Sequence, residues 1–289
     1  MLVPSVFASI PSPSSDSFGI GPLNFNFYGL MIALGVLAAV EIGRKRWEAR
    51  GGNGDDIIEI AKWAVPAGLI GTRIYHVATD WKRYQGRWLD AFKIWEGGLG
   101  IPGGLVLGVA VGVWYVRSQG WSVTGLLDSV IPGIPVAQAI GRLGNWFNQE
   151  IYGRPSDLPW AVEIDNPSAE FEGFSTFHPT FLYEGLLNLC IAASLIFADR
   201  QKWLKPGAIL PLWMLLYGVA RFIIEGMRTD EASLILGIRV NHWVSGIAVV
   251  VGGIWFLILQ RRDQGEEVAP GPLADDEADG VDEESVDAS

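Results

Sequence analysis

The stretch that decides the fold is Gly141-Arg142-Leu143-Gly144-Asn145-Trp146-Phe147-Asn148-Gln149-Glu150-Ile151-Tyr152-Gly153. It follows an apolar run over residues 126–140 that contains Gly and Pro and is suited to a bilayer. Charged side chains at the rim of a hydrocarbon layer are costly and therefore usually functional. Glycine allows backbone N–H groups to approach a ligand closely. The stretch therefore predicts a polar pocket with an anion-binding arginine, built where a membrane segment meets water.

The composition predicts an all-α polytopic transmembrane protein. Hydrophobic residues make up 49% of the 289 residues, and there are 36 Gly and 13 Trp. The apolar residues form runs of about 20, the length that crosses a hydrocarbon core of about 30 Å. We expect about seven spans, near residues 23–42, 57–79, 99–116, 122–142, 179–198, 206–226 and 240–260.

Three regions are expected along the chain: an extracytoplasmic N-terminal segment (1–22), a transmembrane domain (23–262) and a cytoplasmic tail (263–289). Residues 1–20 lack the basic n-region of a secretory signal. Within the transmembrane domain, the Trp-rich residues 80–98 suit an interfacial segment, and the polar residues 143–178 suit a small extracytoplasmic head.

The acidic charge is concentrated in the tail. Residues 263–289 contain eleven Asp and Glu and no Lys or Arg; removing these eleven from the 32 acidic residues leaves 21, equal to the 21 Lys and Arg. The tail has too little apolar content to fold and is predicted to be disordered. The neutral body has no basic surplus, which argues against nucleic-acid binding.

The first basic cluster sets the expected topology. Arg44, Lys45, Arg46 and Arg50 follow the first span and mark the cytoplasmic side. Seven spans then place the N-terminus outside, the C-terminus inside and the central stretch on the exterior side. Monomer is the default expectation for the oligomeric state.

Two polar helix faces are candidates for anion binding. Arg142 and Asn145 lie three apart and share a helix face, with Gln138 one turn before them. In the sixth expected span, four polar residues share another face: Tyr217, Arg221, Glu225 and Arg228. Two arginines from these faces would grip one phosphate, because the planar guanidinium suits bidentate contacts. The alternative is that Arg221 and Glu225 form only an ion pair that holds helices together.

Other polar residues have mainly structural interpretations. Glu184 needs a partner inside the membrane boundary, and the candidates are Arg73, Arg142 and Arg221; its role is left open between structure and catalysis. Asp128 is expected to have a structural role, either as the partner of a basic residue or as an acceptor for donors at a helix end. The single cysteine, Cys190, is predicted to be a buried small apolar residue. His76 and His242 stand alone without a second ligand at metal spacing, so neither a metal site nor a cofactor is expected.

The central stretch resembles the signature of the prolipoprotein diacylglyceryl transferases of the bacterial cytoplasmic membrane, a G-R-x-G-N-F-x-N-x-E-x-x-G pattern with Trp146 in the aromatic position. The resemblance extends over about residues 20–262. Supporting motifs are Phe27-Tyr28-Gly29-Leu30, Trp95-Glu96-Gly97-Gly98, His178-Pro179 through Tyr183-Glu184, and Tyr217-Gly218 through Arg221 and Glu225.

This resemblance implies transfer of the diacylglyceryl group of phosphatidylglycerol to the lipobox cysteine of a prolipoprotein signal peptide, with formation of a thioether and release of glycerol phosphate. It implies that Arg142 and Arg221 hold the lipid phosphate and that Tyr28, Tyr217 and Glu225 line the pocket. We expect Glu225, Tyr28 or Tyr217 to relay the proton. Asn145, Glu150 and Gly153 fall on signature positions that shape the pocket, and Gly98, Gly103 and Arg228 are also expected to bind phosphatidylglycerol.

One departure from the family pattern concerns the thiol base. Many members have F-H-G-G-L-I-G where this chain reads Ile101-Pro102-Gly103-Gly104-Leu105-Val106-Leu107-Gly108, and that histidine has been proposed as the base. Proline cannot accept a proton, so the base lies elsewhere or no dedicated base is needed. One rival interpretation is an inactive relative that lacks the histidine and only binds phosphatidylglycerol. Another is a transporter of an anionic substrate, but a transporter predicts an internal repeat that this sequence does not show.

Overall fold

The computed structural model describes residues 9–21, 23–93, 97–98 and 100–262. Two sequence predictions lie outside the described residues, the disordered tail and the Trp95-Glu96 pair, and the N-terminal segment is described only from residue 9. The described chain is mostly helical and forms two compact units. One contains the residues up to Arg46 and from Leu127 onward, and the other contains Trp47–Leu126.

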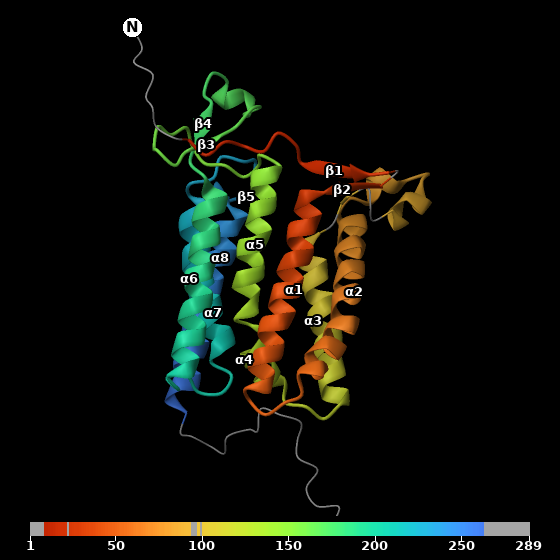
Figure 1. Ribbon diagram of the computed structural model, residues 1–289, viewed down its shortest axis with the longest axis vertical. Helices are drawn as coiled ribbons and strands as arrows, with labels where there is room; N and C mark the ends of the chain where they lie inside the picture. The colour runs from red at the N-terminus through yellow and green to blue at the C-terminus, as the bar shows by residue number, and fades with distance from the viewer. Residues whose placement is uncertain (1–8, 22, 94–96, 99, 263–289) are drawn as a thin grey trace, which may run out of the picture. The chain divides into compact units, whose positions relative to one another are not determined.

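The first unit is built on five helices: α1 (Phe27–Glu48), α5 (Gly133–Phe147), α6 (Thr180–Arg200), α7 (Ile209–Glu225) and α8 (Val240–Arg261). In sequence order, α5 packs on α6, α6 on α7 and α7 on α8 (Figure 1). The chain enters this unit through α4 (Val123–Val130), and Pro132 precedes the first residue of α5. Proline supplies no backbone N–H, so the fourth expected span is two helices rather than one.

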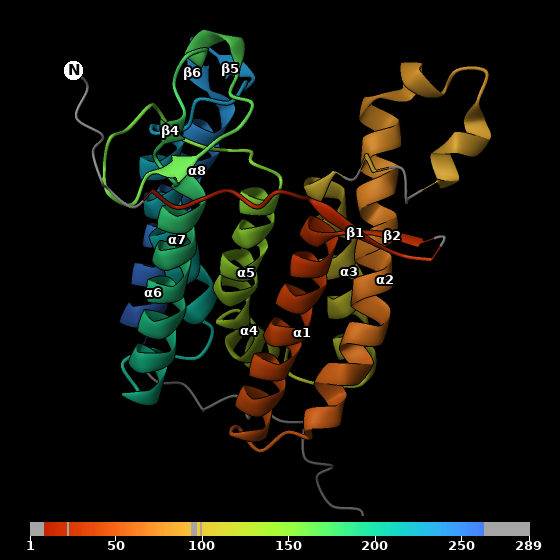
Figure 2. The ribbon, with the colours of Figure 1, turned by 45° about the horizontal axis from the view of Figure 1, so that its top comes forward.

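Three short antiparallel hairpins complete the first unit and are absent from the all-α prediction. They pair β1 (Ser17–Ile20) with β2 (Leu23–Asn26), β3 (Val162–Glu163) with β4 (Thr176–Phe177), and β5 (Leu234–Ile235) with β6 (Ile238–Arg239). Strands of two to four residues are too short for a period-two hydrophobic pattern. Figure 2 shows the last two hairpins beyond the same ends of α6, α7 and α8.

The second unit pairs α2 (Gly54–Thr79) with α3 (Ile101–Ser118). Gly71 and Gly103 face each other where α2 and α3 approach closely, since a Cβ on Gly103 would lie 2.2 Å from the carbonyl oxygen of Gly71. Small residues allow such close approach between membrane helices. The expected interfacial segment contains two 3₁₀ turns, η1 (Trp81–Tyr84) and η2 (Trp88–Phe92), and exposes Trp88, Leu89 and Phe92.

Five helical segments of the described chain are long and apolar enough to cross a membrane: Phe27–Glu48, Ile101–Ser118, Val123–Phe147, Thr180–Arg200 and Val240–Arg261. Together with α2 and α7 they occupy the seven expected positions, although the count of seven spans stays a prediction. Their outer faces are apolar and exposed, as expected for contact with lipid. Cys190 lies on such a face of α6, so the prediction that it is buried was wrong.

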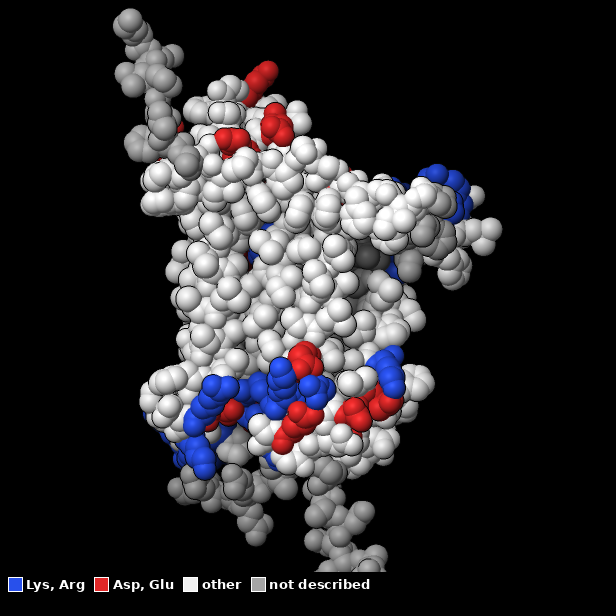
Figure 3. Space-filling view, viewed as in Figure 1, with Lys and Arg blue, Asp and Glu red and all other residues white. Residues whose placement is uncertain are grey.

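Basic side chains gather at one end of the first unit. The last turns of α1, α6 and α8 contain Lys45, Arg46, Arg200 and Arg261. Arg46 bonds Asp199 at 2.9 Å, which joins the ends of α1 and α6. Figure 3 shows Lys and Arg gathered over the lower ends of these two helices. α1 continues as a helix to Glu48, six residues beyond the predicted span end at residue 42, and Glu41 forms ion pairs with Arg44 and Lys45 in this part of the helix.

Candidate functional site

The signature residues Arg142 and Asn145 lie on one face of α5, as the sequence spacing predicts. Arg142 Nη1 donates to Asn145 Oδ1 at 3.0 Å. Asn145 is 1% exposed, and its Nδ2 donates to Oε1 of Glu150 at 2.9 Å. The helix ends at Phe147, so the first five residues of the segment 143–178, which was expected to form the head, continue α5 instead.

A single buried carboxylate bridges the two candidate arginines. Oε1 of Glu184 lies 2.7 Å from Arg142 Nη2, and Oε2 lies 3.0 Å from Arg221 Nη1. The Glu184 side chain is 3% exposed, against 21% for Arg142 and 12% for Arg221. Of the three partners considered for Glu184, Arg142 and Arg221 are therefore the ones it bonds. Because each oxygen holds one guanidinium, α5 and α7 present their arginines to the same place beside α6.

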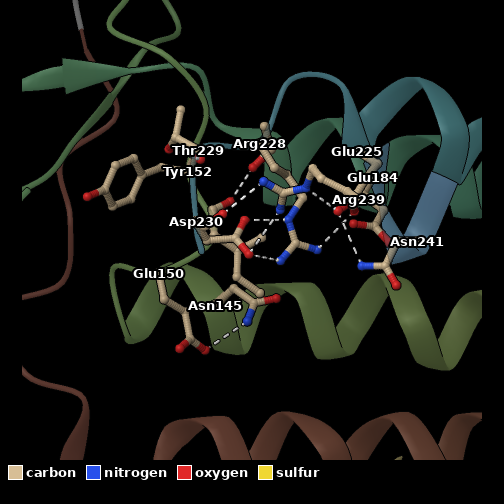
Figure 4. A network of polar contacts seen from close by, with 12 residues as sticks. Asn145, Glu150, Tyr152, Glu184, Glu225, Arg228, Thr229, Asp230, Arg239 and Asn241 are labelled. Atoms are coloured by element: carbon tan, nitrogen blue, oxygen red, sulfur yellow. Dashed lines mark hydrogen bonds and ion pairs between the residues drawn. The ribbon is translucent and has the colours of Figure 1, made fainter. Parts of the chain in front are cut away.

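A second carboxylate, Glu225, contacts Arg221 and two further arginines, Arg228 and Arg239. Its Oε2 lies 2.8 Å from Arg221 Nη2 and 3.7 Å from Arg228 Nη1, and its Oε1 accepts from Arg239 Nε at 2.6 Å. Asn241 adds a weaker bond at 3.3 Å. Glu225 is fully buried. The pair of Arg221 and Glu225 expected from the i, i+4 spacing is present, but it is part of a larger network (Figure 4).

Asp230 closes this network from the loop after α7. Arg228 holds it through two parallel bonds, Nε and Nη2 to the two carboxylate oxygens, each 2.7 Å long. Arg239 Nη2 lies 3.3 Å from the same carboxylate. Burial acts to raise the pKa of Asp230, but the Arg228 bond and the charges of both arginines outweigh it and lower that pKa below its usual value. Burial likewise acts to lower the pKa of Arg228, and the Asp230 bond and charge raise it.

The network has a charge surplus of one. Four guanidinium groups, from Arg142, Arg221, Arg228 and Arg239, meet three carboxylates, from Glu184, Glu225 and Asp230. Glu150 is exposed and lies at the edge of this group, bonded to Asn145. Electrostatic interactions are stronger where water is excluded. Counted over these buried and half-buried groups, the surplus of one positive charge suits one bound monoanion.

Gly153 connects the signature to the Arg228 loop. It forms a β-bridge with Arg228, and its N–H donates to the carbonyl of His178 at 2.9 Å. A Cβ on Gly153 would lie 2.8 Å from His178 Cβ and 3.1 Å from the Met227 carbonyl oxygen. Only glycine fits there without movement of the loop. Its contribution to the site is thus close backbone packing.

The two candidate tyrosines lie at different depths of the first unit. The ring of Tyr28, at the start of α1, lies against α5, where a Cβ on Gly144 would come within 2.5 Å of it. Tyr217 lies one turn before Arg221 on α7, stacked on Trp213, and interacts electrostatically with Glu184, Arg221 and Arg142. Tyr217 therefore belongs to the arginine network, and Tyr28 packs on the signature helix.

Four residues considered in the sequence analysis belong to the second unit: Gly98, Gly103, Arg73 and Pro102. Gly98 has a positive φ of 72° and accepts a bond from Arg73, and Gly103 makes the contact between α2 and α3. Arg73 donates to the backbone carbonyls of four residues, Asp90, Ala91, Gly97 and Gly98. Pro102 occupies the first turn of α3, where a missing N–H costs nothing. The described contacts of these residues lie within their own unit.

Sequence reasoning overlooked two members of the network, Arg239 and Asp230. Neither shares a helix face with the motifs, because both lie in the α7–α8 connection. The available signal was an Arg and an Asp flanking a short apolar segment between two spans.

For Asp128, the expected structural role is confirmed, because its Oδ2 accepts from the Gly207 N–H at 2.6 Å just before α7.

Comparison with known proteins assigns the family. A family model described as prolipoprotein diacylglyceryl transferase matches residues 16–259. The chain is 47% identical over 272 residues to phosphatidylglycerol--prolipoprotein diacylglyceryl transferase 1 of Streptomyces coelicolor, covering 93% of this chain and 79% of that protein. Similar relatives named phosphatidylglycerol--prolipoprotein diacylglyceryl transferase occur in Frankia alni (46% identity, 92% and 71% covered) and Paenarthrobacter aurescens (40%, 99% and 95%). With its apolar helices and its match over most of the chain, this membrane protein belongs to the prolipoprotein diacylglyceryl transferase family.

Proposed function

We propose that this chain transfers the diacylglyceryl group of phosphatidylglycerol to the cysteine thiol of a prolipoprotein lipobox, forming a thioether and releasing glycerol phosphate. The observation that carries the proposal is the bridge from Arg142 through Glu184 to Arg221. It aims two guanidinium groups at one place that a phosphate would occupy.

The charge and the free donors of the network fit a phosphodiester. Phosphatidylglycerol carries one negative charge, equal and opposite to the surplus of four arginines over three carboxylates. Arg142 Nε is buried and bonds no acceptor among the described residues, so it remains a donor for a phosphate oxygen. Planar guanidinium groups bind such oxygens in pairs.

The chemical step is a displacement at carbon. The thiolate sulfur attacks the glyceryl carbon that bears the phosphate, the S–C bond forms and the C–O bond breaks. The electron pair of the C–O bond goes to the phosphate oxygen. Arg142 and Arg221 stabilise this developing charge, which is the largest contribution that such a site makes to the rate. Asn145, Glu150, Gly153 and Arg228 shape the pocket around them. Gly98 and Gly103, whose described contacts lie within the second unit, stay predicted phosphatidylglycerol-binding residues.

The proposed topology places this site at the exterior side of the cytoplasmic membrane. Glu184 and Arg200 lie sixteen residues apart on α6, about 24 Å along a helix. The basic ends of α1, α6 and α8 are assigned to the cytoplasm by the excess of Lys and Arg. A prolipoprotein whose lipobox has crossed the membrane would meet the site there.

The test is transfer from radiolabelled phosphatidylglycerol to a lipobox peptide by the purified full chain in detergent. We expect thioether-linked diacylglyceryl on the cysteine, lost in Arg142→Ala and kept in the exposed control Arg200→Ala. Lipid binding without transfer by the wild-type protein would identify an inactive phosphatidylglycerol-binding relative instead. Uptake of an anionic solute into vesicles without transfer would favour a transporter.

A further inference from the structure

The thiol loses its proton when the thioether forms, and the contacts of one carboxylate in this chain would change when a phosphate binds. Among the described residues, the side chain of Glu184 bonds only Arg142 and Arg221, the two arginines proposed to bind phosphate. Glu225 differs, because Arg239 and Asn241 hold it independently of the lipid. A phosphate that engages the two arginines would therefore free Glu184 and leave Glu225 in place.

We propose that Glu184 accepts the proton of the attacking thiol and passes it to the phosphate oxygen that leaves. This inference rests on the proposed function and adds a catalytic residue to it. Glu184 stands between the two phosphate ligands, so its carboxylate borders both reacting groups. A buried carboxylate that has lost its cationic partners is costly as an anion, and this cost favours taking up a proton.

The charge count supports this route for the proton. With four guanidiniums, three carboxylates and the bound phosphodiester monoanion, the network is neutral. When the C–O bond breaks, the leaving phosphate monoester becomes a dianion, and the network would carry one uncompensated negative charge. A proton moved from sulfur to Glu184 restores neutrality. Its later transfer to the phosphate oxygen yields the monoester monoanion and returns Glu184 to its ionised form.

Release of the glycerol phosphate product is consistent with the same proton relay. Once the monoester leaves as a monoanion, Glu184 regains Arg142 and Arg221, which are the contacts seen in the structure. The internal carboxylate then competes with the product for the arginines and promotes release. Removing the carboxylate should therefore slow the chemical step while leaving phosphate binding equal or stronger.

Two variants test the relay. In Glu184→Gln, the neutral amide keeps the shape but cannot accept the proton, and kcat at pH 7 should fall about 100-fold, within the usual range for a proton-transfer group. Glu184→Asp keeps a carboxylate and should retain more of the rate. The matched control is the exposed Glu170→Gln, which should behave as wild type.

Three readouts separate a relay from a merely structural role. Binding of a fluorescent short-chain phosphatidylglycerol should be unchanged or tighter in Glu184→Gln. Thermal unfolding in detergent should show that the variant is folded. As the pH rises toward about 8.5, the ordinary thiol pKa, solvent supplies the thiolate, so the rate of Glu184→Gln should recover by about tenfold relative to wild type.

The outcomes distinguish this inference from the proposed function. Near-normal kcat in Glu184→Gln, or a loss of rate that is independent of pH, would overturn the relay. Loss of lipid binding together with loss of rate would also overturn it, because Glu184 would then only hold the arginines in place. If the wild-type chain shows no transfer at all, the proposed function fails and the relay fails with it.

Discussion

The Nε atom of Arg239 lies 2.6 Å from Oε1 of Glu225, and this contact bonds the start of α8 to the end of α7. Glu225 in turn holds Arg221 at 2.8 Å. The orientation of Arg221 therefore depends, through Glu225, on Arg239, a residue of the α7–α8 connection that is not proposed to contact the phosphate. Arg239 is accordingly a positioning residue for the arginine clamp formed by Arg142 and Arg221.

Replacing Arg239 by Gln should weaken both folding and turnover. The change leaves the buried Oε1 of Glu225 with only the 3.3 Å bond from Asn241, and removing one partner of a buried ion pair costs about 3–5 kcal/mol. We expect a lower unfolding temperature and a fall in kcat/KM. The same substitution at exposed Arg261, at the other end of α8, is the control. A variant with unchanged stability and activity would contradict the positioning role.

Asp230 should make the stability of the first unit sensitive to acid. Its pKa is lowered in the folded protein, so its ionised form stabilises the fold at neutral pH. That contribution is lost as the pH falls below the ordinary Asp value of about 3.9 and through the folded value. Unfolding temperatures of the wild type and Asp230→Asn should differ at pH 7 and converge in acid. The control Asp157→Asn should show no such convergence, and a difference that stays constant with pH would refute the prediction.

Arg221→Lys should remove most of the transfer activity. The guanidinium reaches Glu184 with Nη1 and Glu225 with Nη2, and a single ammonium cannot reproduce that planar fork. Loss of one preorganised donor to a developing oxyanion costs on the order of 100-fold or more in kcat. The measurement is the rate of transfer to the lipobox peptide, with Arg200→Lys as control. Near-normal turnover would show that two-point binding by Arg221 is not required.

Gly153→Ala should displace the loop that carries Arg228. The added methyl group would lie 2.8 Å from His178 Cβ and 3.1 Å from the Met227 carbonyl, and overpacking of this kind costs about 1–3 kcal/mol. We expect lower stability and weaker binding of the fluorescent lipid. Gly246→Ala on α8 is the matched control, since nothing lies within 4 Å of a Cβ there. Equal behaviour of the two variants would exclude a packing role for Gly153.

The sequence alone determined the helical membrane body and the residues at its polar end. Apolar runs of about 20 residues located α2, α3, α6, α7 and α8 within three residues and α1 within six, because hydrocarbon thickness fixes their length. The i, i+3 spacing predicted the contact between Arg142 and Asn145, and the i, i+4 spacing predicted the pair of Arg221 and Glu225. Within one helix, sequence separation sets which side chains meet.

Tertiary structure decided everything that joins different segments. Sequence left Glu184 with three possible partners, and helix packing gave it Arg142 and Arg221 while Arg73 bonds backbone carbonyls in the other unit. The sequence alone gave no reason to pair Arg239 with Glu225, which are in contact in the structure. The physical reason is that helix periodicity fixes only short-range neighbours, whereas contacts between α5, α6, α7 and the α7–α8 loop depend on how whole helices pack.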